Sequence, residues 1–131
     1  MNTKLLMTAS SVFMGLIGMA LIFMPDETLK TLGQEPNNTL NLILQLTGAL
    51  YFGFAVTNWM AKTVLIGGIY ARPLSIGNFS HFLIAGLALI KVSMNTVSAN
   101  TYTYVLTFLY IAFAILFGYV FVTHPKQKQS T

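Results

Sequence analysis

Residues 5–24 read LLMTASSVFMGLIGMALIFM, an apolar run without a single charged side chain. A helix rises about 1.5 Å per residue, so this run extends for about 30 Å, the thickness of the hydrocarbon core of a bilayer. A cleaved signal peptide is the alternative for such a segment. Signal peptides have a shorter apolar run and an A-x-A-like cleavage site, and no such site precedes Pro25. The run therefore predicts a transmembrane helix.

Three further apolar runs have a similar length and cover about residues 40–60, 74–94 and 102–122. Polar residues and prolines separate them, as expected between helices. The runs lack the alternation of a half-buried strand, and lipid offers no partner to the unpaired backbone groups of an open sheet. The sequence therefore predicts an all-α fold, in which residues 1–131 form a single transmembrane domain, an integral membrane four-helix bundle.

The polar segment that follows the first run favours a short helix on the membrane surface. Pro25 and the two acids after it suit a first helical turn, where free N–H groups carry partial positive charge. Gly33 is a residue that commonly ends a helix. We predict an interfacial helix over about residues 25–33 on the outer side of the membrane, with Leu29 and Leu32 facing the membrane.

The composition agrees with a membrane protein. Charged residues make up 8% of the chain and hydrophobic residues 55%, whereas a soluble domain has roughly a quarter charged residues. The chain has no cysteine, which excludes disulfides, thiolate metal sites and cysteine-based catalysis. Its seven Lys and Arg against three Asp and Glu raise the question of nucleic acid. Because these basic residues lie at the ends of the apolar runs, we expect no nucleic-acid partner.

The basic residues predict an orientation, because short loops rich in Lys and Arg stay in the cytoplasm. With four spans, five basic residues fall on one side and two on the other. The first group is Lys4, Lys62, Arg72, Lys126 and Lys128, and the second is Lys30 and Lys91. We therefore predict a multi-pass protein of the bacterial inner membrane with the N-terminus and C-terminus both cytoplasmic.

The predicted spans contain no acidic residue, which is the most informative functional signal. Asp26, Glu27 and Glu35 all lie outside them. Carboxylate-based proton coupling, paired-carboxylate catalysis and acidic metal sites therefore lack their residues. The small four-helix multidrug exporters match in length and topology, but they depend on a glutamate in the first helix. We predict no catalytic residue and no metal site.

Polar side chains gather instead in the second and third predicted spans and near their inner ends. Basic and hydrogen-bonding groups at headgroup depth suit an anionic lipid or a quinone-like amphiphile. The candidate ligand-binding residues are Asn58, Lys62, Tyr70, Arg72, Asn78 and His81. The alternative for Lys62 and Arg72 is that they serve only as topology anchors.

His81 is the sharpest single candidate. A neutral imidazole can shuttle a proton, ligate a metal or hydrogen-bond a ligand. A b-type haem normally needs two axial histidines, and the other histidine, His124, follows the end of the last apolar run. We therefore expect no haem within one chain and no cofactor other than a bound lipid or quinone.

A second polar set is expected to form hydrogen bonds between helices, each typically worth less than about 1–2 kcal/mol in a membrane. Its members are Gln45, Thr47, Tyr51 and Asn95. Small residues also recur at helical spacing, as Ser11, Gly15 and Gly18 do in the first run. Such residues let helix backbones approach closely, either within one bundle or between copies of the chain.

The stretches LIFMP at 21–25, Leu29, LG at 32–33 and TGALYFG at 47–53 resemble small four-helix bacterial membrane proteins of the DoxX-like type. The resemblance covers roughly the first half of the chain. It implies a four-helix membrane fold, and some members of that group are associated with membrane redox complexes. It carries over no functional residue.

We expect a non-enzymatic membrane protein, an accessory or ligand- and lipid-binding bundle. One alternative is a quinone-handling or redox-complex membrane subunit that uses His81 and Arg72. A second is a small transporter or channel, which the missing intramembrane acids and internal repeat disfavour. The expected partners are the lipid bilayer and either a second copy of the chain or a larger membrane complex.

Overall fold

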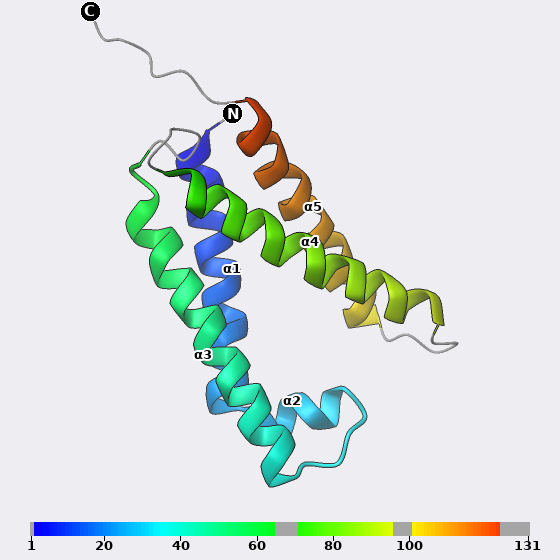
Figure 1. Cartoon of the computed structure of the whole chain (residues 1–131). Coiled ribbons are helices and arrows are strands. Elements are labelled where there is room, and N and C mark those ends of the chain that lie inside the picture. The colour runs from blue at the N-terminus through cyan, green and yellow to red at the C-terminus, as the bar shows by residue number, and fades with distance from the viewer. Residues whose placement is uncertain (1, 65–70, 96–100, 124–131) are drawn as a thin grey trace, which may run out of the picture. The chain divides into compact units, whose positions relative to one another are not determined.

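The computed structural model describes residues 2–64, 71–95 and 101–123 (Figure 1). Within these ranges the regular structure is helical and no strand occurs. The helices are α1 (Thr3–Phe23), α2 (Pro25–Thr31), α3 (Asn38–Ala61), α4 (Arg72–Asn95) and α5 (Thr101–Thr123). The all-α prediction is confirmed.

Four of these helices, α1, α3, α4 and α5, are long and apolar enough to cross a membrane. They have between 21 and 24 residues, which at about 1.5 Å per residue gives lengths of about 32–36 Å. Their bounds agree with the predicted spans to within two residues. The chain is therefore a multi-pass membrane protein, as its sequence predicts.

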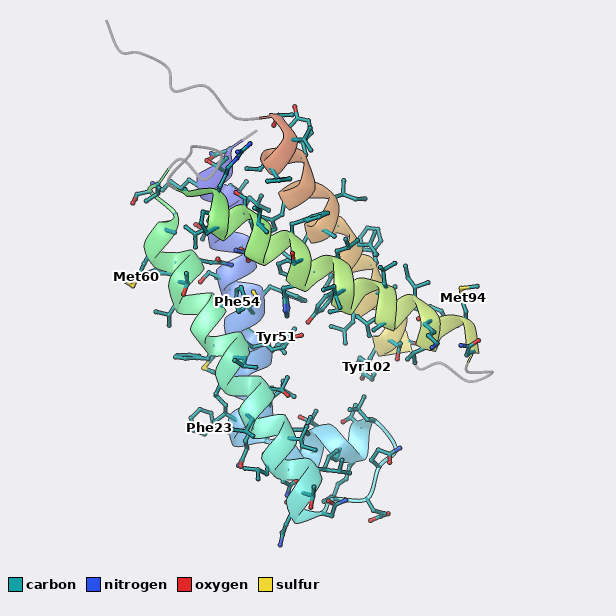
Figure 2. All side chains as sticks on the ribbon, in the orientation of Figure 1. Phe23, Tyr51, Phe54, Met60, Met94 and Tyr102 are labelled. Atoms are coloured by element: carbon teal, nitrogen blue, oxygen red, sulfur yellow. The ribbon has the colours of Figure 1, made fainter. Side chains whose placement is uncertain are left out.

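Many large apolar side chains project outward from the long helices (Figure 2). Phe23, Met60 and Met94 are 77%, 74% and 80% exposed, and Ile84 and Phe108 are similarly accessible. In water such surfaces would drive aggregation. In a bilayer they face hydrocarbon of the same polarity, so they need no protein partner.

The chain divides into two compact units, Met1–Thr63 and Val64–Thr131. Unit 1 contains α1, α2 and α3, and unit 2 contains α4 and α5. Each unit is built on one pair of antiparallel long helices. That the two units form a single domain stays a prediction.

In unit 1, the backbones of α1 and α3 approach each other closely at two facing glycines. A Cβ atom added to Gly18 would lie 2.9 Å from the carbonyl oxygen of Gly48 and 2.9 Å from the backbone nitrogen of Phe52. Atoms of the backbone cannot move aside as a side chain can. Glycine is therefore required at this crossing, and the small residues expected to bring helices together do so within the chain.

The short helix α2 packs against both α1 and α3. It begins at Pro25 as predicted and ends at Thr31, and Gly33 follows with a φ of 72°, a left-handed conformation that favours glycine. Leu29 is 3% exposed. The prediction that Leu29 faces the membrane is wrong, because α2 folds back onto the ends of the two long helices and buries this side chain.

Unit 2 is held together by interlocking aromatic and small residues of α4 and α5. The ring of Phe82 stacks on those of Phe113 and Phe117, with centroid distances of 4.8 and 5.8 Å. Gly86 leaves space for the side chain of Ile111. A Cβ atom added to Gly86 would lie 2.9 Å from Ile111 Cδ1. This packing aligns α4, which carries three of the predicted site residues, along α5.

Candidate functional site

Asn58 lies fully buried in unit 1, where α3 faces α1. Its Nδ2 donates a hydrogen bond to Ser10 Oγ at 3.1 Å and lies 3.9 Å from Met14 Sδ. Ser10 Oγ in turn donates to the carbonyl oxygen of Met7 at 3.1 Å. These contacts make Asn58 a link between two spans. An amide in this position stabilises the pairing of the two helices.

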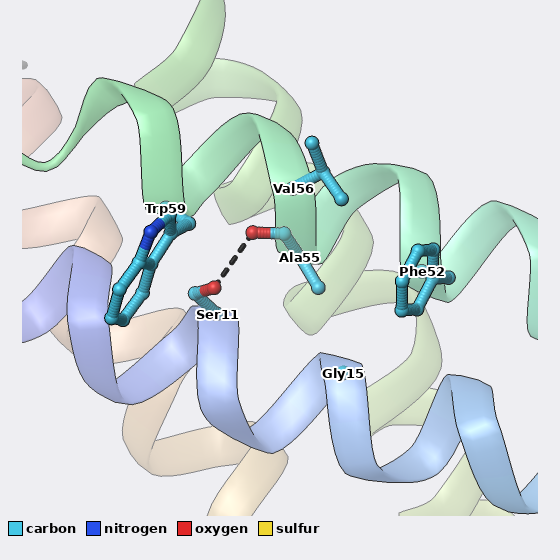
Figure 3. Close-up of a pocket in the computed structure, with 6 residues that line it drawn as sticks. All are labelled: Ser11, Gly15, Phe52, Ala55, Val56 and Trp59. Carbon is cyan, nitrogen blue, oxygen red and sulfur yellow. Dashed lines mark hydrogen bonds between the residues drawn. The ribbon is translucent and has the colours of Figure 1, made fainter.

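A groove runs along the surface between α1 and α3 (Figure 3). Its volume is about 220 Å³, and it is lined by Ser11, Gly15, Phe52, Ala55, Val56 and Trp59. Gly15 and Ala55 have small side chains and form the floor of the groove. The rings of Phe52 and Trp59 lie at its two ends (Figure 3). The groove exists because small residues on both helices lie between bulky aromatic ones.

The groove is apolar in spite of its serine. Ser11 Oγ donates a hydrogen bond to the backbone carbonyl oxygen of Ala55 at 2.7 Å (Figure 3). This hydroxyl therefore does not offer its proton to a molecule in the groove. Phe52, Val56 and Trp59 are 45%, 44% and 49% exposed, which opens the groove to the surroundings of the helix pair. The arrangement suits a hydrocarbon chain better than a polar substrate, because it offers contact area and few hydrogen-bonding groups.

A basic side chain stands at the Trp59 end of the groove. Lys62 Nζ lies 3.1 Å from the centroid of the Trp59 ring, the position of a cation–π contact. The ring thus contributes to the groove and also holds an ammonium group. Among the predicted site residues that the structure describes, Lys62 is placed beside this groove through its contact with Trp59.

The predicted residues of unit 2 lie along α4. The His81 ring is 5.2 Å from that of Phe82, edge to face, and 6.0 Å from that of Tyr110 on α5. Asn78 is buried and its Nδ2 donates to the carbonyl oxygen of Leu74 in the same helix at 2.9 Å. His81 therefore sits in the aromatic packing between α4 and α5.

The other predicted residues are spread over the chain. Arg72 begins α4, with its guanidinium carbon 5.9 Å from the centroid of the Phe121 ring. Tyr70 lies outside the described residues. Asn58 and Lys62 belong to unit 1, and Arg72, Asn78 and His81 to unit 2. That these groups converge on one site stays a prediction.

Within the described residues, Thr47 is the member of the expected intramembrane polar set with a hydrogen bond inside its own helix. Thr47 Oγ1 donates to the carbonyl oxygen of Ile43, one turn earlier in its own helix, at 2.8 Å. Gln45 and Asn95 are exposed, and Tyr51 is half-buried. Unit 2 has its own polar contact between spans, a 3.3 Å hydrogen bond between the hydroxyls of Ser93 and Thr107. Neither of these two residues belongs to the expected set.

Ser10 is another residue that the sequence reasoning missed. It lies six residues after Lys4, and Asn58 lies four residues before Lys62. If both lysines mark the same membrane surface, the two polar side chains lie at similar depth in neighbouring antiparallel helices. Matching the depths of polar residues in successive spans would have predicted this pair.

Among the residues that the structure describes, no three histidines or acids come together as metal ligands would. Comparison of the chain with protein-family models, curated proteins and solved structures finds no match. The resemblance to DoxX-like proteins therefore stays a prediction. The groove between α1 and α3, with Lys62 at its end, is the candidate functional site.

Proposed function

We propose that this protein is a non-enzymatic accessory protein of the bacterial inner membrane that binds a lipid in the groove between α1 and α3. The observation that carries the proposal is the groove itself, which is apolar, open and placed within two candidate spans. Hydrocarbon surrounds the helices at this depth, so an acyl chain meets the groove without leaving the bilayer. Contacts with the residues that line the groove would then hold one lipid molecule in place, while the surrounding lipids stay mobile.

The size of the groove supports a lipid chain over a substrate of drug-like size. Sites that enclose such molecules usually have volumes of about 300–1,000 Å³. The groove here has about 220 Å³ and an open side. It therefore fits a segment of a flexible chain that lies along the helices, while the remainder of the lipid stays in the bilayer.

Filling the groove should remove the bound lipid. In Gly15→Leu the new side chain occupies the floor between Phe52 and Trp59, and the Cβ atom itself fits, at 3.5 Å from that of Ala55. We expect native mass spectrometry from a mild detergent to show a retained lipid on the wild-type protein and a several-fold smaller fraction on this variant. Equal retention by the two proteins would contradict the proposal.

The matched control is Gly53→Leu. It introduces the same side chain into α3 at a position where an added Cβ meets nothing within 4 Å, and Gly53 does not line the groove. Retention should match the wild type in this variant. A retained quinone that His81→Ala releases would instead support the quinone-handling alternative, for which the rings around His81 offer stacking partners.

The proposed orientation places both termini in the cytoplasm. It is supported by the five basic residues assigned to that side, against two on the other. A reporter active only in the periplasm should therefore give no signal when it is fused after Thr131. The same reporter inserted after Gln34, in the loop between α2 and α3, should give a strong one. The reverse pattern would overturn the orientation.

A further inference from the structure

Two lysines flank the same end of the groove. On α1 the residues Lys4, Thr8, Ser11 and Gly15 are spaced by four, three and four, so they lie on one face of the helix. Spacings of three and four, in the reverse direction, likewise relate Lys62, which directly follows the end of α3, to Trp59, Ala55 and Phe52 within α3. Figure 1 shows that α1 and α3 run antiparallel, so the start of α1 lies beside the end of α3. The spacing therefore places one lysine from each helix end at the same end of the groove.

The distance from the lysines to the floor of the groove matches the depth of one leaflet. Lys4 and Gly15 are eleven residues apart, which is about 16 Å along a helix. Half of a typical hydrocarbon core is about 15 Å. A lipid with its headgroup at the lysines therefore has its chain beside Ser11 and Gly15, where the groove lies.

The charge at this end of unit 1 is positive. The three acidic residues of unit 1 all lie at the opposite end of the unit, in α2 and in the loop that follows it. They are Asp26, Glu27 and Glu35. The positive end of the α1 dipole and the negative end of the α3 dipole lie at this same end and offset each other. The two lysines therefore determine the sign of the local charge. Trp59, a residue that favours the membrane interface, holds the ammonium of Lys62 beside the groove.

We infer that Lys4 and Lys62 form the headgroup site of an anionic phospholipid whose acyl chain lies in the groove between α1 and α3. The inference rests on the proposed function and adds the class of lipid. The two ammonium groups attract the phosphate and the net negative charge of the headgroup, while the groove holds the chain regardless of the headgroup.

The test compares phosphatidylglycerol with phosphatidylcholine of identical acyl chains, added to the delipidated full-length protein and measured by native mass spectrometry. We expect the wild type to prefer phosphatidylglycerol. Each basic residue near an anionic surface contributes a factor of about five, so Lys62→Gln should lower retention of phosphatidylglycerol about five-fold and Lys4→Gln/Lys62→Gln about 25-fold. Retention of phosphatidylcholine should fall much less in both variants, because the choline ammonium already neutralises its phosphate.

Two control variants test whether the effect comes from the positive charge and from its position, rather than from a change in folding. Lys62→Arg keeps the charge over Trp59 and should keep the preference. Lys30→Gln removes a charge from α2 at the opposite end of unit 1, and it should also keep the preference. If the double variant still prefers phosphatidylglycerol, the headgroup site is wrong while lipid binding stands. If the wild type retains neither lipid, the proposed function itself fails.

Discussion

Gly18→Ala is expected to lower the free energy of unfolding by about 1–3 kcal/mol, the range for overpacking a close-packed interior. The new methyl group would lie 2.9 Å from the carbonyl oxygen of Gly48 and 2.9 Å from the nitrogen of Phe52. Both atoms belong to the backbone of α3, so the two helices must move apart where they cross. Gly48→Ala should act in the same direction, because its Cβ would lie 2.9 Å from the carbonyl oxygen of Gly18.

The measurement is the loss of helical circular dichroism when the detergent-solubilised protein is titrated with a denaturing detergent. Gly53→Ala is the matched control, since it makes the same substitution in α3 where an added Cβ has open space. Alanine is favoured over glycine in a helix by up to about 1 kcal/mol, so the control should be unchanged or more stable. A Gly18→Ala protein as stable as the control would show that the helices do not meet at these glycines.

Removing the amide of Asn58 is expected to have the second large effect. Asn58→Ala deletes the hydrogen bond from Nδ2 to Ser10 Oγ and leaves a gap beside Met14, both in the buried interior. We expect a loss of about 1–3 kcal/mol in the same unfolding measurement. Ser10→Ala should be milder, because it leaves the amide and most of the packing in place.

A double-mutant cycle isolates the pair. The coupling between Asn58→Ala and Ser10→Ala should be about 0.6 kcal/mol, the average measured for hydrogen bonds between membrane helices, and no more than about 1.7 kcal/mol, the maximum. Thr47→Ala is the control, because that hydroxyl bonds only to the carbonyl oxygen of Ile43 among its described contacts. Additive effects of the two Asn58 and Ser10 substitutions would mean that the observed contact does not contribute to stability.

The spans could be predicted from sequence because their physical signal is local. Twenty apolar residues are sufficient to define a helix that crosses lipid, and its ends follow from nearby residues. Asn37, for example, caps α3 by accepting a hydrogen bond from the backbone nitrogen of Leu40 at 2.9 Å. Pro25 and Gly33 likewise mark the boundaries near α2. None of these inferences requires knowing how helices pair.

The groove could not be predicted, because it depends on which residues of α1 meet which residues of α3. Ser11 and Gly15 stand out in the sequence as small, but a low floor becomes a groove only between Phe52 and Trp59 of the partner helix. The prediction that Leu29 faces the membrane is wrong for a related reason. Its helix is amphipathic, but whether its apolar side meets lipid or protein is decided by tertiary contacts.

The backbone contact between Gly18 and Gly48 also has a consequence for how the protein is made. The pairing of α1 with α3 uses only residues from the first half of the chain. Nascent chains are synthesised at about 5–20 residues per second and fold from their N-terminal parts first. The hairpin of α1 and α3 can therefore close in the membrane while the ribosome is still translating α4 and α5, so the groove exists before the second unit has been made.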